Sequence, residues 1–132
     1  MATLSEKQKE FLSKPYVGVV TTLREDGSPH STVVWVEPQD GLVSFNTAYG
    51  RAKPRHLEHD PRVSLTVVDP DDAYRWLSVD GTAELTTEGA DEQIDRLAKK
   101  YIGADTYPWR QEGEQRVSVR IRPEHVNAYG IE

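Results

Sequence analysis

The sequence contains no cysteine and no long run of apolar residues. The absence of cysteine excludes a disulfide framework, a thiolate metal site and a cysteine nucleophile. A helix that crosses a membrane needs roughly 18 or more consecutive apolar residues, and no such stretch is present. The first residues also lack the apolar segment of a signal peptide. These absences predict a soluble, cytoplasmic protein with no membrane partner.

Positive charge is scarce as well. The 132 residues include 22 acidic and 16 basic side chains, which gives a formal net charge of -6. Nucleic acids are bound through broad basic surfaces, so this balance excludes them as the main partner and confines any anion site to a local cluster. Hydrophobic residues make up 36% of the chain. We therefore expect one small domain, residues 1–132, that gains stability by burying a face against a second subunit.

Residue patterns for metal binding and nucleophilic catalysis are missing too. None of the four histidines has the spacing to carboxylates that a metal site requires, and His56 and His59 lack a third ligand nearby. The chain contains no Gly-x-Ser-x-Gly elbow and neither of the common glycine-rich nucleotide loops. We therefore predict no bound metal and no catalytic side chain that acts as a nucleophile.

What the sequence does contain is a series of short segments rich in β-branched residues with period-2 alternation. Six strands are predicted, at residues 16–23, 30–38, 42–48, 62–69, 74–85 and 115–123. Asp26-Gly27 between the first two is a strong hairpin signal, and Gly81 within the fifth predicts a bulge or a sharp bend. On the last strand, Val117, Val119 and Ile121 are predicted to face inward.

Three helices are expected around these strands. The first follows a capping box in Thr3-Leu4-Ser5-Glu6. The second begins at Pro54, since proline suits the first helical position, and stops before Pro61. The third shows helical spacing from Ala90 to Tyr101 and ends near Gly103. Six strands with hairpin spacing and a few helices predict a closed or nearly closed antiparallel barrel with the helices packed outside it.

A basic cluster interrupts the acidic chain at residues 51–56, where Arg51, Lys53, Arg55 and His56 stand without an acidic neighbour. A residue before proline favours an extended backbone, and side chains two apart on an extended chain point the same way. We therefore expect the first three cations to converge at the start of the second helix, where a phosphate or carboxylate is favoured. The alternative is a solvated turn whose charges balance the nearby Glu58 and Asp60.

The large aromatic residues gather near strand ends and loops. They are Trp35, Tyr49, Tyr74, Trp76, Tyr107 and Trp109. Flat side chains beside a basic cluster can enclose a planar ring with an anionic tail. They can equally fill an interface between subunits, and the residue types do not separate the two roles.

Three stretches together resemble a known superfamily. They are "VGVVTTLREDGSPHSTVVWV", "VSFNTAYGRAKPRHLEHDPRVSLTVVD" and "WLSVDGTAEL". In this order they are similar to the flavin-reductase-like split β-barrels, which include the pyridoxamine 5′-phosphate oxidases, and most similar to the branch that uses the deazaflavin coenzyme F420. The similarity covers residues 4–129. It implies a mostly β fold, a six-stranded antiparallel split β-barrel of the FMN-binding type with peripheral helices, and a homodimer with two cofactors in grooves between the subunits.

The resemblance also implies a set of cofactor-binding residues. Arg51, Lys53 and Arg55, with Ala52 between them, match the basic pattern that holds the phosphate and the glutamate tail of F420. The remaining residues that the family pattern places around the ring are Ser31, Thr32, Val34 and Trp35 on one strand, Asn46 and Thr47 on another, and Tyr74 and Trp76 from the second subunit. Tyr107 and Trp109 are expected on the substrate side.

The implied function is an F420-dependent oxidoreductase that transfers a hydride between the coenzyme and a small conjugated organic substrate. Because the cofactor carries this chemistry, no protein side chain is expected to be catalytic. Two alternatives remain open from the sequence. One is an oxidoreductase of the same fold that binds flavin mononucleotide (FMN), and the other is a non-catalytic carrier of F420 or a tetrapyrrole.

Overall fold

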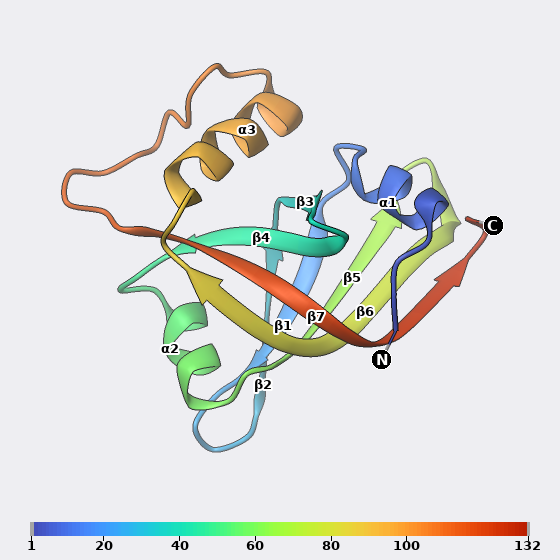
Figure 1. Ribbon diagram of the computed structural model, residues 1–132, viewed down its shortest axis with the longest axis horizontal. Coiled ribbons are helices and arrows are strands. Elements are labelled where there is room, and N and C mark those ends of the chain that lie inside the picture. Colours follow the sequence, from blue (N-terminus) through green and yellow to red (C-terminus); the bar gives the residue numbers. More distant parts are fainter. Residues whose placement is uncertain (1, 132) are drawn as a thin grey trace.

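The computed structural model describes residues 2–131. Over this range it has three helices and seven strands, in a mostly β fold as predicted (Figure 1). The helices are α1 Glu6–Leu12, α2 Ala52–His59 and α3 Ala90–Ile102; the strands are β1 Gly18–Leu23, β2 Pro29–Val34, β3 Val36–Gln39, β4 Leu42–Ala48, β5 Arg62–Asp69, β6 Asp72–Thr86 and β7 Arg116–Tyr129. All neighbouring strands are antiparallel, in the order β2-β1-β5-β6-β7-β4-β3.

The predicted second strand, residues 30–38, is divided in the structure, so the predicted count of six strands is wrong by one. β2 pairs with β1, whereas β3 pairs with β4 at the opposite edge of the sheet. Only Trp35 separates these two edge strands in the chain. The two edges must therefore approach each other, and the sheet curls into the half-open barrel that a split β-barrel requires (Figure 1).

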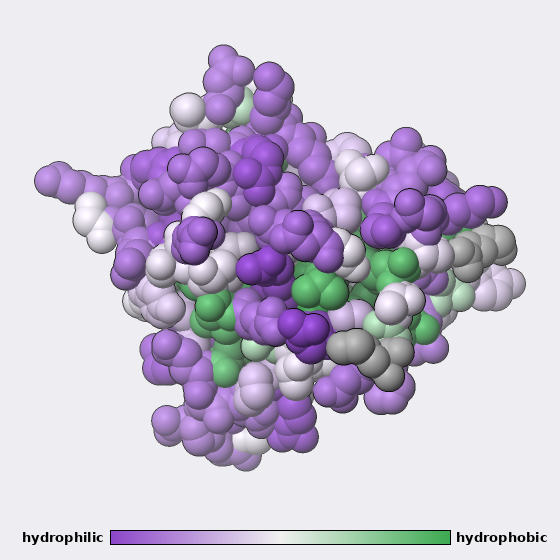
Figure 2. Space-filling view, in the orientation of Figure 1, coloured by the Kyte–Doolittle hydropathy of each residue, from purple (hydrophilic) through white to green (hydrophobic). Residues whose placement is uncertain are grey.

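The concave side of the curled sheet holds the hydrophobic core. Val117, Val119 and Ile121 on β7 are fully buried, as predicted from their alternation. Val119 and Ile121 belong to a cluster that also includes Val20, Phe45, Leu65, Val67, Leu77 and Val79. Burying each such side chain contributes roughly 1.5–3 kcal/mol, so this cluster is the main source of stability. The face seen in Figure 2 is mostly hydrophilic, and its apolar residues appear as small separate patches.

The predicted bend at Gly81 is confirmed as a break in strand register. The pairing of β6 with β7 shifts between Asp80 and Gly81. A Cβ atom added at Gly81 would overlap the carbonyl oxygen of Arg122 on β7. Glycine is therefore required here by the close approach of two backbones, and the bend lets the long strand β6 follow the curvature of the barrel.

The structure corrects the predicted start of α1 and confirms the predicted end of α3. The capping box of α1 is formed by Ser5 and Gln8, not by Thr3 and Glu6. The shift has a simple cause, because a box needs a glutamine or glutamate three residues after the capping hydroxyl, and the sequence offers both frames. α3 ends as predicted at Gly103, whose positive φ of 71° suits glycine.

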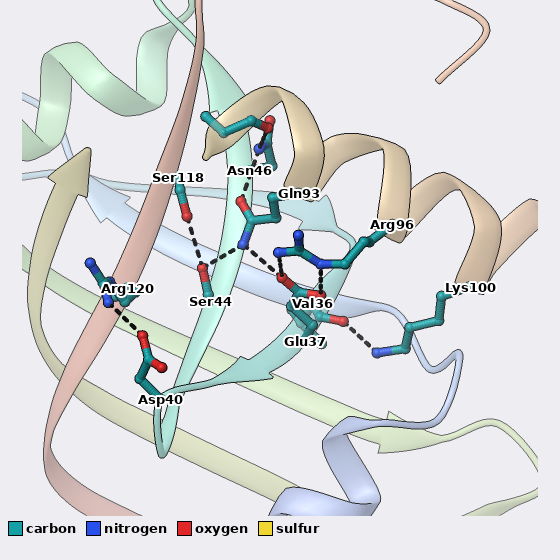
Figure 3. A network of polar contacts seen from close by, with 11 residues as sticks. Val36, Glu37, Asp40, Ser44, Asn46, Gln93, Arg96, Lys100, Ser118 and Arg120 are labelled. Atoms are coloured by element: carbon teal, nitrogen blue, oxygen red, sulfur yellow. Dashed lines mark hydrogen bonds and ion pairs between the residues drawn. The ribbon is translucent and has the colours of Figure 1, made fainter. Parts of the chain in front are cut away.

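A half-buried lysine ties α3 to the rest of the molecule at the end where α1 lies. The Lys100 ammonium donates hydrogen bonds to the carbonyl oxygens of Leu12, at 2.7 Å, and of Val36. Figure 3 shows the second of these contacts. Burial lowers the pKa of this ammonium to about 8. Lys100 therefore links three elements, α3, α1 and β3. Its ammonium loses a proton at a lower pH in the folded protein than in the unfolded chain.

This pKa gives a testable pH dependence. The ordinary pKa is 10.5, so between about pH 8 and pH 10 the folded protein binds fewer protons at Lys100 than the unfolded chain, and the stability rises with pH. Urea denaturation measures the free energy of unfolding of the wild type and of Lys100→Met. In this window we expect the wild-type value, relative to that of the variant, to rise by roughly 1 kcal/mol per pH unit. Lys99→Met, at an exposed neighbour, is the control; a pH-independent difference for Lys100→Met would contradict the prediction.

Candidate functional site

A cavity of about 180 Å³, called here the first cavity, lies where β2, β4 and β7 meet the start of α2 and one face of α3. It is lined by Val33, Val34, Trp35, Asn46, Thr47, Arg51, Lys53, Ile94, Leu97, Tyr107, Trp109 and Arg116. Six residues predicted to bind the cofactor are thus brought together here: Val34, Trp35, Asn46, Thr47, Arg51 and Lys53.

The basic cluster is helical where an extended backbone was predicted. α2 begins at Ala52, two residues before the predicted start, and Arg51 is its N-cap. Pro54 does not prevent this, because the first turn of a helix has free N–H groups and tolerates proline. Lys53 and Arg55 therefore diverge. Lys53 turns with Arg51 into the first cavity, whereas Arg55 does not, so the predicted convergence of all three cations is wrong.

Arg55 lies instead in a second cavity, of about 350 Å³, with Ala52. Arg24, Glu25, His30 and His56 complete its lining. The His56 ring is buried and its Nδ1 lies 2.9 Å from the Thr22 hydroxyl. Burial, and then the positive charge of neighbours that include Arg55, lowers the pKa of His56. The second cavity is therefore a cationic site on the other side of α2.

Four of the cations that line the two cavities have no acidic partner. Within residues 2–131, no carboxylate lies within 4.0 Å of the charged groups of Arg24, Arg51, Lys53 or Arg55. Asp60, which was considered as their counter-charge, pairs with Arg62 at 2.7 Å. This arrangement argues against a turn that balances its own charges and favours an anion as the missing partner.

Lys53 is the most enclosed of these cations. Its ammonium donates to the Thr32 hydroxyl at 3.2 Å, so the predicted residue Thr32 adjoins the first cavity through Lys53. Burial lowers the pKa of Lys53, and the positive charges of Arg51 and Arg116 lower it further. A bound anion would stabilise the charged form of Lys53, because it would offset both the burial and the repulsion by the two arginines.

The side chain of Asn46 belongs to a hydrogen-bond network that joins β4, α3 and β7. Its amide nitrogen donates to Gln93 Oε1 and to the carbonyl oxygen of Ala90, both at 2.9 Å, and its Oδ1 accepts from Arg116 Nε at 2.9 Å. Figure 3 shows Asn46 beside Gln93, which donates to Ser44 and thereby ties α3 to β4. Asn46 therefore positions Arg116 and α3, and only its outer edge faces the first cavity.

Two buried polar atoms in the first cavity lack a hydrogen-bond partner within the described residues. They are the hydroxyl of Thr47, whose side chain is 1% exposed, and Nη1 of Arg116, which is 4% exposed. Glu114 lies 3.2 Å from this Nη1 as an ion-pair partner, without hydrogen-bond geometry. A buried polar group without a partner costs about 1–3 kcal/mol. The Thr47 hydroxyl, which unlike the Arg116 guanidinium has no ion-pair partner either, therefore marks a place for a ligand atom. The sequence did not identify Arg116 as a site residue, because a charged residue at the start of a strand is normally exposed to solvent.

An aromatic cluster forms the wall of the first cavity next to α3. Trp35 stacks on Tyr101 with ring centroids 5.4 Å apart and an interplanar angle of 9°. Tyr107 and Trp109 meet Trp35 at 6.2 and 6.4 Å. The Arg116 guanidinium lies 5.1 Å from the Tyr107 ring centroid. Tyr101 was not among the predicted aromatic residues, because its helical spacing indicated only core packing.

The other predicted residues, Ser31, Tyr74 and Trp76, do not line either cavity. Ser31 points outward and its hydroxyl lies 2.8 Å from that of Thr21. Tyr74 and Trp76 are on β6, and neither lines the two cavities described above. Tyr74 is 76% exposed.

Tyr74 and Trp76 continue an exposed apolar stripe on the outer side of the sheet. Val33 on β2 faces Val19 on β1, and further along the sheet Trp76 lies between Val68 and Tyr129. Val33 is 65% exposed and the other valines are more than two-fifths exposed. A row of exposed apolar side chains across several strands is typical of an interface.

The described residues form neither a metal-binding cluster nor a membrane-spanning helix. Residues 2–131 contain no group of three or more side chains placed to hold a metal ion. Nor do any of the helices in that range have the length and apolar character to cross a membrane.

Comparison with known proteins places these features in context. A family model described as pyridoxamine 5′-phosphate oxidase matches residues 4–130. The chain is 29% identical over 126 residues to an F420H(2)-dependent biliverdin reductase from Mycobacterium tuberculosis. The aligned region covers 93% of this chain and 86% of that enzyme. A pyridoxine/pyridoxamine 5′-phosphate oxidase from Citrobacter koseri is 41% identical over 56 residues, so the match spans only 25% of that longer enzyme and 41% of this chain.

Two solved structures are similar over almost the whole chain. One is described as an F420 reductase, with a TM-score of 0.81, 28% identity, and coverage of 94% of this chain and 98% of that one. The other is the conserved hypothetical protein Rv2991 from Mycobacterium tuberculosis, with a TM-score of 0.74, 28% identity, and coverage of 96% and 84%.

Proposed function

The chain belongs to the pyridoxamine 5′-phosphate oxidase family, and from that premise we propose that it is an F420-dependent reductase of a small conjugated organic substrate. The observation that carries this proposal is the pair of unpaired cations, Arg51 and Lys53, beside the unpartnered hydroxyl of Thr47 in one cavity. The relatives named for F420 support the choice of cofactor.

The residues of the first cavity fit such a cofactor. Arg51 offers a fork for phosphate oxygens and Lys53 a compact charge, while Thr47 offers a hydroxyl to a polar edge of the ring. Val34 and Trp35 supply an apolar and aromatic wall for a planar ring. When bound, reduced F420 supplies the hydride that, together with one proton from solvent, reduces a conjugated double bond. The contribution of the chain is to orient both reactants and to exclude water from the cavity.

The second cavity favours F420 over FMN. β2 runs from one cavity to the other, since Val34 lines the first, Thr32 contacts Lys53, and His30 lines the second. FMN ends at its phosphate, whereas F420 continues beyond it with glutamate carboxylates. We assign the second cavity, with Arg24 and Arg55, to these carboxylates. FMN would leave these cations without a partner.

One subunit supplies only part of the site. The first cavity, which is assigned to the ring and the phosphate, has a volume of only about 180 Å³, and neither Tyr74 nor Trp76 contributes to its lining. The exposed apolar stripe offers a surface for a second copy of the chain. We propose a homodimer in which Tyr74 and Trp76 of one subunit complete the wall of the other's cofactor site.

A turnover experiment tests the proposed function. Reduced F420 is mixed without oxygen with the protein and with either biliverdin or a simple quinone, and the absorbance of oxidised F420 is followed. We expect this absorbance to return only when protein and acceptor are both present, and we expect sedimentation to give the mass of a dimer. Tight F420 binding without oxidation by any acceptor would show a carrier, and a monomer that turns over would contradict the shared site.

A further inference from the structure

The loop at residues 103–115, between α3 and β7, carries an exposed tryptophan beside the first cavity. Figure 1 shows this loop leaving α3 and returning to the sheet at the start of β7. Trp109 is 59% exposed, although its ring packs on Tyr107 at 5.7 Å and lies 6.4 Å from Trp35. The interplanar angles are 81° to Tyr107 and 45° to Trp35, so neither ring stacks flat on the indole, and more than half of Trp109 stays open to solvent.

Two hydrogen bonds to one carboxylate hold this loop in place. Asp95 Oδ1 on α3 accepts from the backbone N–H of Tyr107 at 2.8 Å and from Arg110 at 2.7 Å. Arg110 also donates to Asp91, one turn earlier on the helix, at 3.1 Å. The bonds bracket Trp109 on both sides in the sequence. The position of the indole is therefore fixed by contacts to the helix, with little help from burial of the indole itself.

We infer that Trp109 is a substrate-stacking surface that gives the protein a preference for extended planar conjugated acceptors, and that Asp95 is a positioning residue that sets this surface. This inference rests on the proposed function. An aromatic ring that is exposed, held by a charged anchor and contacted by Tyr107 and Trp35 at steep angles can stack a second planar molecule without rearrangement. A compact acceptor reaches the inner part of the cavity and does not require the outer indole.

Biliverdin and a simple quinone serve as the extended and compact probes. Biliverdin binding is measured in the presence of oxidised F420, where no turnover occurs, through the circular dichroism that a bound tetrapyrrole acquires. We expect Trp109→Ala to weaken biliverdin binding about tenfold and Trp109→Phe to recover most of the loss. With reduced F420, Trp109→Ala is expected to raise the KM for biliverdin by a clearly larger factor than the KM for the quinone.

The anchor is tested with Asp95→Ala and, should that variant fold poorly, with Arg110→Ala. Each is expected to weaken biliverdin binding, and to add nothing once Trp109→Ala is present, because all three changes remove one surface. Asp105→Ala, in the same loop and almost fully exposed, is the control. Unchanged biliverdin binding in Trp109→Ala, additive losses, or no binding by the unaltered protein would overturn the inference. Biliverdin bound through Trp109 without turnover would count instead against the proposed function.

Discussion

Replacing Arg51 and Lys53 together with glutamine is expected to weaken F420 binding by about a hundredfold or more, since each charge-assisted hydrogen bond to a phosphate is worth about 1.5–3 kcal/mol. Both side chains line the first cavity without an acidic partner, and Lys53 is partly buried. Glutamine keeps similar reach and polarity but removes the charge. Fluorescence titration with F420 measures the loss.

The matched control is the pair Lys7→Gln and Lys14→Gln. These two lysines also lack a carboxylate within 4.0 Å in the described residues, but they line a separate cavity beside α1. Their replacement changes the net charge of the protein equally. An equal loss of affinity in both double variants would show a general electrostatic effect, and an unchanged affinity in the first would remove Arg51 and Lys53 from the site.

Gly81→Ala is expected to lower the free energy of unfolding by about 3 kcal/mol, the upper part of the range for inserting atoms into a closely packed site. The added methyl group would overlap the carbonyl oxygen of Arg122, and backbone atoms cannot rotate away as a side chain can. β6 and β7 must then separate or shift in register at the bulge. Urea denaturation measures the change.

Gly113→Ala separates this steric effect from backbone strain. Gly113 has a positive φ of 76° and open space around the position of a Cβ atom, so its replacement strains the backbone without a clash. That strain costs roughly 1–2 kcal/mol. The account requires Gly81→Ala to be clearly more destabilising than Gly113→Ala; an equal or smaller effect would show that the two strands do not approach as closely as described.

The strands were predictable because a half-buried sheet leaves a period-2 record in the sequence. Val117, Val119 and Ile121 alternate with polar residues, and all three are buried as expected. The break at Trp35 left no such record. Val34 and Val36 are both buried, so the alternation continues unchanged across the point where the chain passes from one sheet edge to the other. That transfer depends on pairing with β1 and β4, which are remote in sequence.

The site was predictable where residue type alone decides its chemistry. Arg51 and Lys53 stood out because cations without acidic neighbours are unusual in an acidic chain. The division of the basic cluster between two cavities was not predictable, because it depends on whether α2 starts at Ala52 or Pro54, and the local preference before proline pointed the wrong way. Arg116 was missed because its burial follows from α3 and from Asn46, both distant in the chain.

The curled sheet explains why these groups meet at one end of the barrel. Lys53 and Arg51 stand at the start of α2, directly after β4, while Trp35 marks the point where β2 gives way to β3. Both lie where the two sheet edges approach, and α3 covers the same end through its contacts with β4 and β7 (Figure 1). The first cavity therefore brings the cations at the start of α2 together with the aromatic rings beside α3.

The most direct test compares the dissociation constants of the purified protein for F420 and for FMN under the same conditions. Both ligands carry a planar ring and a phosphate, and only F420 carries the carboxylates that we assign to the second cavity. F420 is expected to bind about tenfold or more tightly than FMN, since each additional charge-assisted contact is worth at least about 1.5 kcal/mol. Equal or tighter binding of FMN would contradict this expectation.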